Sequence, residues 1–125
     1  MQTELFPVIG AIMPEIDTPP EQATKGLRYN AGKVRMDLVP PDALKALAEV
    51  YTKGAEKYAA RNWEKGLDWS ECYGSLLRHA NAWNTGEDRD EESGQLHMAH
   101  VAWNAMALLT FALRGIGEDS RNKLT

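Results

Sequence analysis

The stretch LHMAHVAWNAMALLTFAL at residues 96–113 decides the fold, because it contains no acidic side chain, lysine or arginine. Apolar side chains occupy most of its positions, which predicts a helix that is buried around most of its circumference. His97, His100 and Asn104 recur at i, i+3 and i+7 and so form one polar row on that helix. A buried polar group without a partner costs about 1–3 kcal/mol, so the row must face polar side chains, water, a metal ion or a ligand. A satisfied core histidine pair and a ligand site both account for the row.

Two further helices are predicted before this stretch. The first is expected over residues 41–58, because it starts with proline, which is favoured in the first turn of a helix. Ser70 is the expected N-cap of the second, which should end near Gly86 and carry His79 on its apolar face. The sequence therefore predicts an all-α protein.

The chain divides into a predicted arm and a predicted domain. Residues 1–24 are rich in proline, threonine and acids and lack a periodic pattern, which is typical of a flexible arm. Residues 25–125 should form one all-α domain. Three long helices in so short a chain leave apolar surface uncovered, so we expect a helical bundle completed by assembly into a homodimer or homotetramer.

Composition excludes several classes of function. A formal net charge of −4 argues against a general affinity for nucleic acid, which needs a basic excess. Cys72 is the single cysteine, so it cannot form an internal disulfide and fits a reducing cytoplasm. Proline and glycine interrupt the apolar segment at residues 5–13, and histidines and an asparagine interrupt residues 96–113, so we expect neither a secretion signal nor a membrane span.

An acidic segment, EDRDEE at residues 87–92, links the helix that carries His79 to the helix that carries His97. A solvated loop is the simplest interpretation. Five carboxylates in six positions repel one another, however, and a divalent cation is the usual way to accommodate such a cluster. We expect Mg²⁺ or Mn²⁺, with imidazole favouring Mn²⁺. The candidate metal ligands are Glu87, Asp88, Asp90, Glu92 and His97.

All three histidines fall on helix faces that should be buried, with lysines and arginines nearby in the sequence. This combination suits a metal ion and a polyphosphate, whose phosphorus an activated water can attack. No glycine-rich phosphate loop and no serine nucleophile motif is present. The catalytic candidates are His79, His97 and His100. The nucleotide-binding candidates are Lys33, Arg35, Lys57 and Arg78 for phosphates, Asn62 and Trp63 for the base, and Asn104.

Four motifs in this order resemble the phage dATP/dGTP pyrophosphohydrolases related to the MazG-like all-α nucleotide pyrophosphohydrolases. They are RYNAGKVRMDLVPP (28–41), KGAEKYAARNWEKG (53–66), LLRHANAWNTGED (76–88) and DEESGQLHMAHVAWNAMALL (90–109). The resemblance implies a helical fold that oligomerises. It also implies cleavage of a purine deoxynucleoside triphosphate, dGTP or dATP, to the monophosphate and pyrophosphate with Mg²⁺ or Mn²⁺, in the host cytoplasm.

The chain departs from the MazG pattern, which places an ExxE pair on one helix and an ExxD pair on the next. Here the position of the ExxD pair reads His97-Met98-Ala99-His100. The acidic segment, or Glu49 and Glu56 on one face of the first helix, would then supply the missing carboxylates. A helical interaction module without enzymatic activity, and a phosphohydrolase that releases nucleoside and triphosphate, are the alternative functions.

Overall fold

The computed structural model describes residues 24–124, which belong to two units divided after Leu38. The described part of the first unit is irregular apart from a short 3-10 helix, η2 (Met36–Leu38). Beside it, the guanidinium of Arg35 donates two hydrogen bonds of 2.8 Å to the carboxylate of Asp37. The arm predicted for residues 1–24 lies, except for Thr24, outside the described residues.

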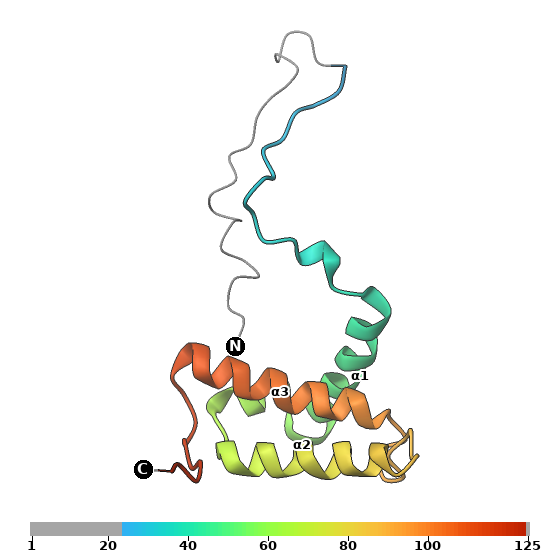
Figure 1. Ribbon diagram of the computed structural model, residues 1–125, viewed down its shortest axis with the longest axis vertical. Helices are drawn as coiled ribbons and strands as arrows, with labels where there is room; N and C mark the ends of the chain where they lie inside the picture. The colour runs from blue at the N-terminus through green and yellow to red at the C-terminus, as the bar shows by residue number, and fades with distance from the viewer. Residues whose placement is uncertain (1–23, 125) are drawn as a thin grey trace. The chain divides into compact units, whose positions relative to one another are not determined.

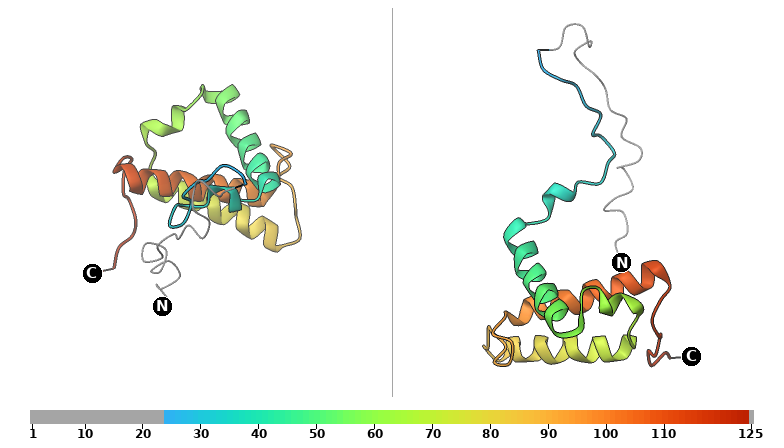
Figure 2. Two further views of the ribbon diagram at one scale, coloured as in Figure 1. Left: turned by 90° about the horizontal axis from the view of Figure 1, so that it is seen from above. Right: turned by 180° about the vertical axis from the view of Figure 1, so that it is seen from behind.

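The second unit consists of helices and the segments that join them. In chain order these are α1 (Pro41–Tyr58), the 3-10 helix η3 (Asn62–Lys65), α2 (Trp69–Asn84) and α3 (His97–Arg114). No β-strand occurs in residues 24–124, so the all-α prediction is confirmed for this part of the chain. Helices α2 and α3 lie side by side and run in opposite directions, and α1 crosses α3 steeply (Figures 1 and 2).

The predicted bounds of α1 are confirmed, whereas the predicted cap of α2 is wrong. Asp68, not Ser70, is the N-cap of α2, and its carboxylate accepts a 3.1 Å hydrogen bond from the backbone N–H of Glu71. Ser70 has a different partner, because its hydroxyl donates to the carbonyl of Ser120 at 2.7 Å. The helix ends at Asn84, two residues before the predicted Gly86.

The core is small and lies between α2 and α3. Cys72, Ala107 and Phe111 are buried in it, and Phe111 is fully enclosed. Around these three residues pack partly buried side chains from every element of the second unit except α1: Trp63, Trp69, Trp103, Leu108 and Ile116.

The expectation that α3 is buried around most of its circumference is wrong for the single chain. Leu109 is 54% exposed and Leu113 is 79% exposed, because the packing of α3 against α1, α2 and η3 leaves part of its surface open. None of the described helices has the length and apolar character that a membrane crossing requires.

The segment after α3 turns back to the start of α2. The indole N–H of Trp69 donates to the carbonyl of Ile116 at 3.1 Å, and Glu118 pairs with Leu67 and Trp69 through backbone hydrogen bonds of 3.1 and 2.9 Å. Gly117 allows this approach. It has a φ of 84°, and a Cβ atom there would lie 2.6 Å from the carbonyl oxygen of Leu67.

Candidate functional site

The acidic loop between α2 and α3 is an ordered turn. The backbone N–H of Asp90 donates to the carbonyl of Gln95 at 2.8 Å, and that of Gly94 donates to the carbonyl of Asp90 at 2.7 Å. One carboxylate oxygen of Asp90, Oδ2, accepts from the backbone N–H of Ser93 at 2.9 Å. These bonds turn Asp90 toward the helices, so this carboxylate is only partly exposed while Asp88 lies in solvent.

The three histidines of the chain meet beside this loop. His79 comes from the last turns of α2, and His97 and His100 come from the first turns of α3, which runs antiparallel to it. The Nδ1 atoms of His79 and His97 are 2.9 Å apart, and the rings of His79 and His100 stack with centroids 4.3 Å apart. The polar row predicted on α3 therefore faces polar partners on α2 and the loop.

Each of the two histidines on α3 has an oxygen partner from the loop. Nε2 of His97 lies 2.6 Å from a carboxylate oxygen of Glu87, and His97 is 3% exposed. Nε2 of His100 lies 2.7 Å from the hydroxyl oxygen of Ser93. Both rings are therefore fixed in orientation.

Burial sets the charge of these groups at neutral pH. Burial lowers the pKa of His79, and the neighbouring His100 lowers it further. Burial likewise lowers the pKa of His100. Partial burial alone would raise the pKa of Asp90, but the hydrogen bonds from Ser93 and the nearby histidines outweigh it, so the pKa of this carboxyl is lowered. The site thus contains neutral imidazoles beside an ionised carboxylate.

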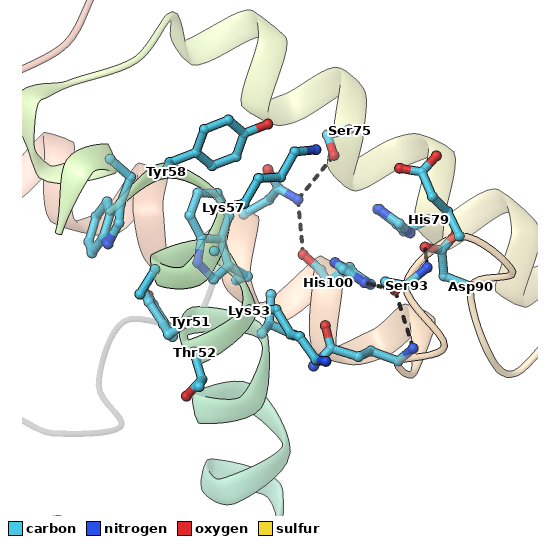
Figure 3. Close-up of a pocket in the computed structure, with 18 of the residues that line it drawn as sticks. Tyr51, Thr52, Lys53, Lys57, Tyr58, Ser75, His79, Asp90, Ser93 and His100 are labelled. Carbon is cyan, nitrogen blue, oxygen red and sulfur yellow. Dashed lines mark hydrogen bonds between the residues drawn. The ribbon is translucent and has the colours of Figure 1, made fainter. Parts of the chain in front are cut away.

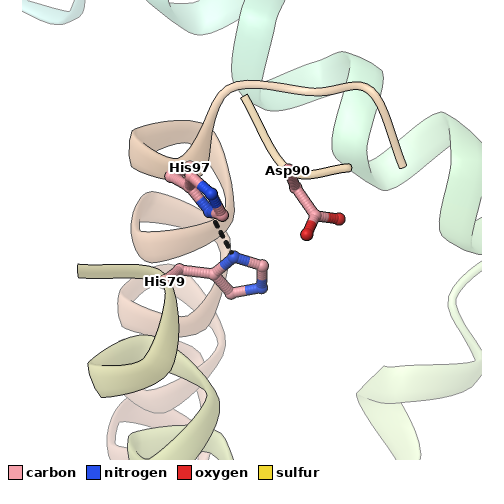
Figure 4. Close-up of side chains that lie close together, drawn as sticks. All are labelled: His79, Asp90 and His97. Carbon is pink, nitrogen blue, oxygen red and sulfur yellow. Dashed lines mark hydrogen bonds between the residues drawn. The ribbon is translucent and has the colours of Figure 1, made fainter. Parts of the chain in front are cut away.

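Three of these side chains could hold a metal ion together. His79, Asp90 and His97 each offer one ligand atom, and these atoms all lie within 4.8 Å of one another (Figure 4). Neutral imidazole nitrogens and a carboxylate oxygen are the donor atoms that divalent transition ions use in proteins.

The candidate metal site opens into a cavity of about 1320 Å³. Figure 3 shows Tyr51 and Tyr58 at one end and His79 and Asp90 at the other, with Lys57 between them. The basic side chains that line the cavity are Lys53, Lys57, Arg61 and Arg78. A ligand with a flat aromatic part and an anionic part matches this division.

Aromatic side chains form a continuous cluster at the end of the cavity where Tyr51 lies. The ring of Trp63 lies 5.6 Å from that of Tyr51 and 5.8 Å from that of Trp103, measured between centroids. Trp63 also contacts Phe111, so it belongs to the core as well as to the wall of the cavity.

An unusual turn leads from α1 to η3 along the same wall. Ala59 and Arg61 both have positive φ, 85° and 60°, which is rare for residues with a Cβ atom. Both residues line the cavity. Strained backbone of this kind concentrates at functional sites.

Asn104, the third member of the polar row, is 5% exposed. Its amide nitrogen donates to the carbonyl of His100 at 2.9 Å and to the hydroxyl of Ser75 at 3.3 Å. A carbonyl oxygen can only accept, so these contacts fix which way the amide faces. The amide oxygen is then available to accept a hydrogen bond.

Most residues proposed from the sequence line this one cavity. They are Lys57, Asn62, Trp63, Arg78, His79, Glu87, Asp90, Glu92, His97, His100 and Asn104. Asp88, Glu49 and Glu56 are exposed and are not among the lining residues. Lys33 and Arg35 belong to the first unit, so their contact with phosphates stays a prediction.

Sequence reasoning missed Ser93, Gln95 and Ser75, which also line the cavity. Asp90 was an available signal for a turn, because aspartate side chains in loops commonly accept hydrogen bonds from backbone N–H groups that follow them, but nothing local marked Ser93 itself. Ser75 gave no local signal, since its partner Asn104 is 29 residues away.

The second unit is all-α, and its cavity connects a cluster of histidines and carboxylates to lysines and aromatic rings. These features define a class of protein: a helical protein with a candidate site for a metal ion and a small ligand. The family described as "dATP/dGTP diphosphohydrolase, N-terminal" matches residues 23–121, and the chain belongs to this family. It is also similar to a "dATP/dGTP diphosphohydrolase" of Salmonella phage PMBT28, with 31% identity over 81 residues. That match covers 65% of this chain but only 28% of the phage protein. No solved structure matches the chain. The predicted family resemblance to these phage enzymes is confirmed.

Proposed function

We propose that the protein hydrolyses a purine deoxynucleoside triphosphate, dGTP or dATP, to the monophosphate and pyrophosphate with the help of a divalent ion. The observation that carries the proposal is the shared cavity, which has His79 and Asp90 at one end, aromatic rings at the other and Lys57 between them. Membership in a family named for dATP/dGTP diphosphohydrolases supports the choice of substrate. We further propose that this reaction remodels the nucleotide pool of a phage-infected cell.

The residues of the cavity have distinct roles in this proposal. Lys57 and Arg78 bind the phosphates, because they bring positive charge to the cavity wall. Asn62 and Trp63 bind the base, and Asn104 offers its amide oxygen to a donor on the nucleotide. Phosphate binding by Lys33 and Arg35 of the first unit stays a separate prediction.

The reaction needs a water, a base and a leaving group. A divalent ion, Mg²⁺ or Mn²⁺, would supply two things when bound: positive charge that offsets the phosphate charge, and a lower pKa for a nearby water. His79, Asp90 and His97 would hold it, with Glu87, Glu92 and Asp88 adding negative charge around it. His100 is neutral at pH 7 and accepts the proton of the attacking water. The water oxygen bonds to the α-phosphorus, the bond between that phosphorus and the bridging oxygen breaks, and pyrophosphate leaves with the electron pair.

A product assay tests the proposal directly. The eight common NTPs and dNTPs are incubated separately with the protein and Mn²⁺ or Mg²⁺, and the products are separated by anion-exchange chromatography. We expect a purine deoxynucleoside monophosphate and pyrophosphate in equal amounts. Orthophosphate with a diphosphate would contradict the proposal, and free nucleoside with triphosphate would favour the alternative phosphohydrolase.

The second candidate is a helical interaction module, and the uncovered face of α3 favours it. A ligand that binds the folded state raises the melting temperature. If millimolar Mn²⁺ with dGTP or dATP leaves the melting temperature unchanged, the interaction module replaces the hydrolase.

We also propose that the protein is a homodimer or homotetramer. The exposed side chains of Leu109 and Leu113 are apolar surface that a second copy would cover. Light scattering at micromolar concentration should give two or four times the subunit mass of 13.9 kDa. A mass of one subunit would contradict this.

A further inference from the structure

We propose that His79, Asp90 and His97 form a metal centre for a first-row transition ion such as Mn²⁺ or Fe²⁺ in preference to Mg²⁺, and that Glu87 is not a ligand of this ion but orients His97. The inference deepens the proposed function, since it names the ion class and moves Glu87 out of the ligand set. Its test needs no nucleotide, so it can fail separately from the hydrolase.

The contact between Glu87 and His97 fixes the tautomer of the histidine. A carboxylate only accepts hydrogen bonds, so the 2.6 Å contact places the ring hydrogen of His97 on Nε2. In the neutral ring, Nδ1 then carries the free electron pair. The ring is 3% exposed, and the contacts of its two nitrogens with Glu87 and His79 hold it in this orientation. Metal-binding histidines in proteins are commonly oriented by a carboxylate in this way.

The free nitrogen of His97 points at a second nitrogen. Nδ1 of His79 lies 2.9 Å from it, and two neighbouring ligands of one six-coordinate ion, each at about 2.1 Å, lie roughly 3 Å apart. The same spacing suits a hydrogen bond in which His79 donates from Nδ1. Binding the ion therefore requires the hydrogen of His79 to move from Nδ1 to Nε2, and both rings to tilt so that the two nitrogen lone pairs converge on the ion and no longer point at each other.

Asp90 completes the set with one oxygen. Its Oδ2 atom already accepts the backbone N–H of Ser93, so Oδ1 is the atom available to an ion. The turn from residue 88 to residue 95 holds one oxygen of this carboxylate within 4.8 Å of a ring nitrogen of each of the two histidines. One carboxylate and two neutral imidazoles leave a divalent ion with a net positive charge, which attracts an anionic ligand.

The donor atoms select the class of ion. Mg²⁺ prefers oxygen ligands and loses its water reluctantly, whereas imidazole suits transition ions. Two histidines and one carboxylate also leave about half of an octahedral ion's positions open for water or phosphate oxygens. The centre thus favours Mn²⁺ or Fe²⁺.

Calorimetry on the full chain without nucleotide tests the centre. We expect one Mn²⁺ per chain, with Mg²⁺ bound at least tenfold more weakly. His79→Ala and Asp90→Asn should each abolish Mn²⁺ binding, and circular dichroism checks that both variants remain helical. Equal affinity for Mg²⁺, or unchanged Mn²⁺ affinity in both variants, overturns the centre.

Glu87→Gln tests the positioning role, with Glu91→Gln as a matched control in the same loop. Glu91 is exposed and does not line the cavity, so the control removes the same charge without touching His97. We expect Glu87→Gln to weaken Mn²⁺ binding about 10- to 100-fold and the control to change it less than twofold. The ¹⁵N chemical shifts of His97 should show a protonated Nε2 in the wild type and a mixed tautomer in Glu87→Gln. Equal losses in both variants, or an unchanged tautomer, overturn the role of Glu87.

The outcomes separate the two proposals. If Mn²⁺ binding depends on His79 but the protein hydrolyses no nucleotide, the proposed metal centre stands and the proposed hydrolase activity is wrong. If His79→Ala still hydrolyses nucleotide, the proposed hydrolase activity stands and the proposed metal centre is wrong.

Discussion

The ring of His79 stacks on the ring of His100: the ring centroids are 4.3 Å apart, and the angle between the ring planes is 8°. Two parallel imidazoles in contact are compatible with at most one positive charge, because protonating both places like charges face to face. This pair therefore links the stability of the second unit to pH.

The first prediction follows from the lowered pKa values of His79 and His100. Their partial burial makes the folded protein bind protons more weakly than the unfolded chain, in which a histidine has a pKa of about 6.5. The unfolded state binds more protons below that pH, so the free energy of unfolding should fall as pH decreases from about 6.5. The carboxylate of Asp90 raises the pKa of both His79 and His100, but the lowering caused by burial is larger. Melting temperatures of the metal-free protein at pH 7.5, 6.5 and 5.5 measure this.

His100→Gln is the variant that checks the cause. It should make the melting temperature less dependent on pH between 6.5 and 5.5. A melting temperature that rises toward pH 5.5 in the wild type would contradict the lowered pKa values.

The second prediction concerns Asn104. In Asn104→Asp, a carboxylate oxygen would face the carbonyl of His100, and two acceptors cannot form a hydrogen bond. We expect a loss of about 1–3 kcal/mol in the free energy of unfolding, measured with urea. Asn122→Asp makes the same change at an exposed position outside the helices and should alter stability little. Equal effects would show that the buried amide has no special role.

The third prediction concerns Gly117, which allows the segment after α3 to approach the start of α2 closely. In Gly117→Ala, the new Cβ atom would meet the carbonyl of Leu67, and alanine would also have to adopt positive φ. We expect the free energy of unfolding to fall by about 1–3 kcal/mol. Gly74→Ala is the matched control inside α2, where the nearest atom to a Cβ lies at an ordinary 3.5 Å, and it should stabilise the protein by about 0.5–1 kcal/mol.

The fourth prediction concerns Glu64, which joins η3 to α3. Its carboxylate pairs with Arg114 at 2.7 Å and with Arg61 at 3.2 Å, and the hydrogen bond from Arg114 is the main cause of its lowered pKa. A lowered pKa contributes stability above the unfolded value, which is lost as pH falls through the folded value. Glu64→Gln should therefore lower the melting temperature at pH 7 by a small amount.

The difference between Glu64→Gln and the wild type should shrink below about pH 4.5 and in high salt, because protonation and screening both weaken the ion pairs. A difference that is constant with pH would mean that packing, not charge, is responsible.

Local signals in the sequence predicted the helices well. Pro41 in a first turn gave the start of α1, and the run of uncharged residues gave α3 within one residue at each end. The start of α2 was misplaced by two residues because Asp68 and Ser70 are both favoured N-cap residues. Asp68 caps the helix, whereas the hydroxyl of Ser70 bonds to Ser120, 50 residues away.

The site was predicted in outline only. The three histidines and the acidic segment gave the location of the candidate site, since the loop joins the two helices that carry them. The sequence could not tell which carboxylate turns inward. Hydrogen bonds within the loop decide that Asp90 faces His79, and the 2.6 Å contact with His97 decides the position of Glu87. Asp88 instead contributes its backbone carbonyl, which accepts from the N–H of His97.

His79, Asp90 and His97 come from α2, the loop and the start of α3, so an ion held by all three would close a ring of 19 residues, from 79 to 97, through its coordination bonds. Such a ring restricts the separation of the two antiparallel helices at their connected end. Amide hydrogens between Asn84 and Leu96 would then exchange with solvent more slowly once the ion is bound, while amides at the far end of α3 would keep their rates. Mass spectrometry of deuterium uptake would detect this difference between the loop and the far end of α3.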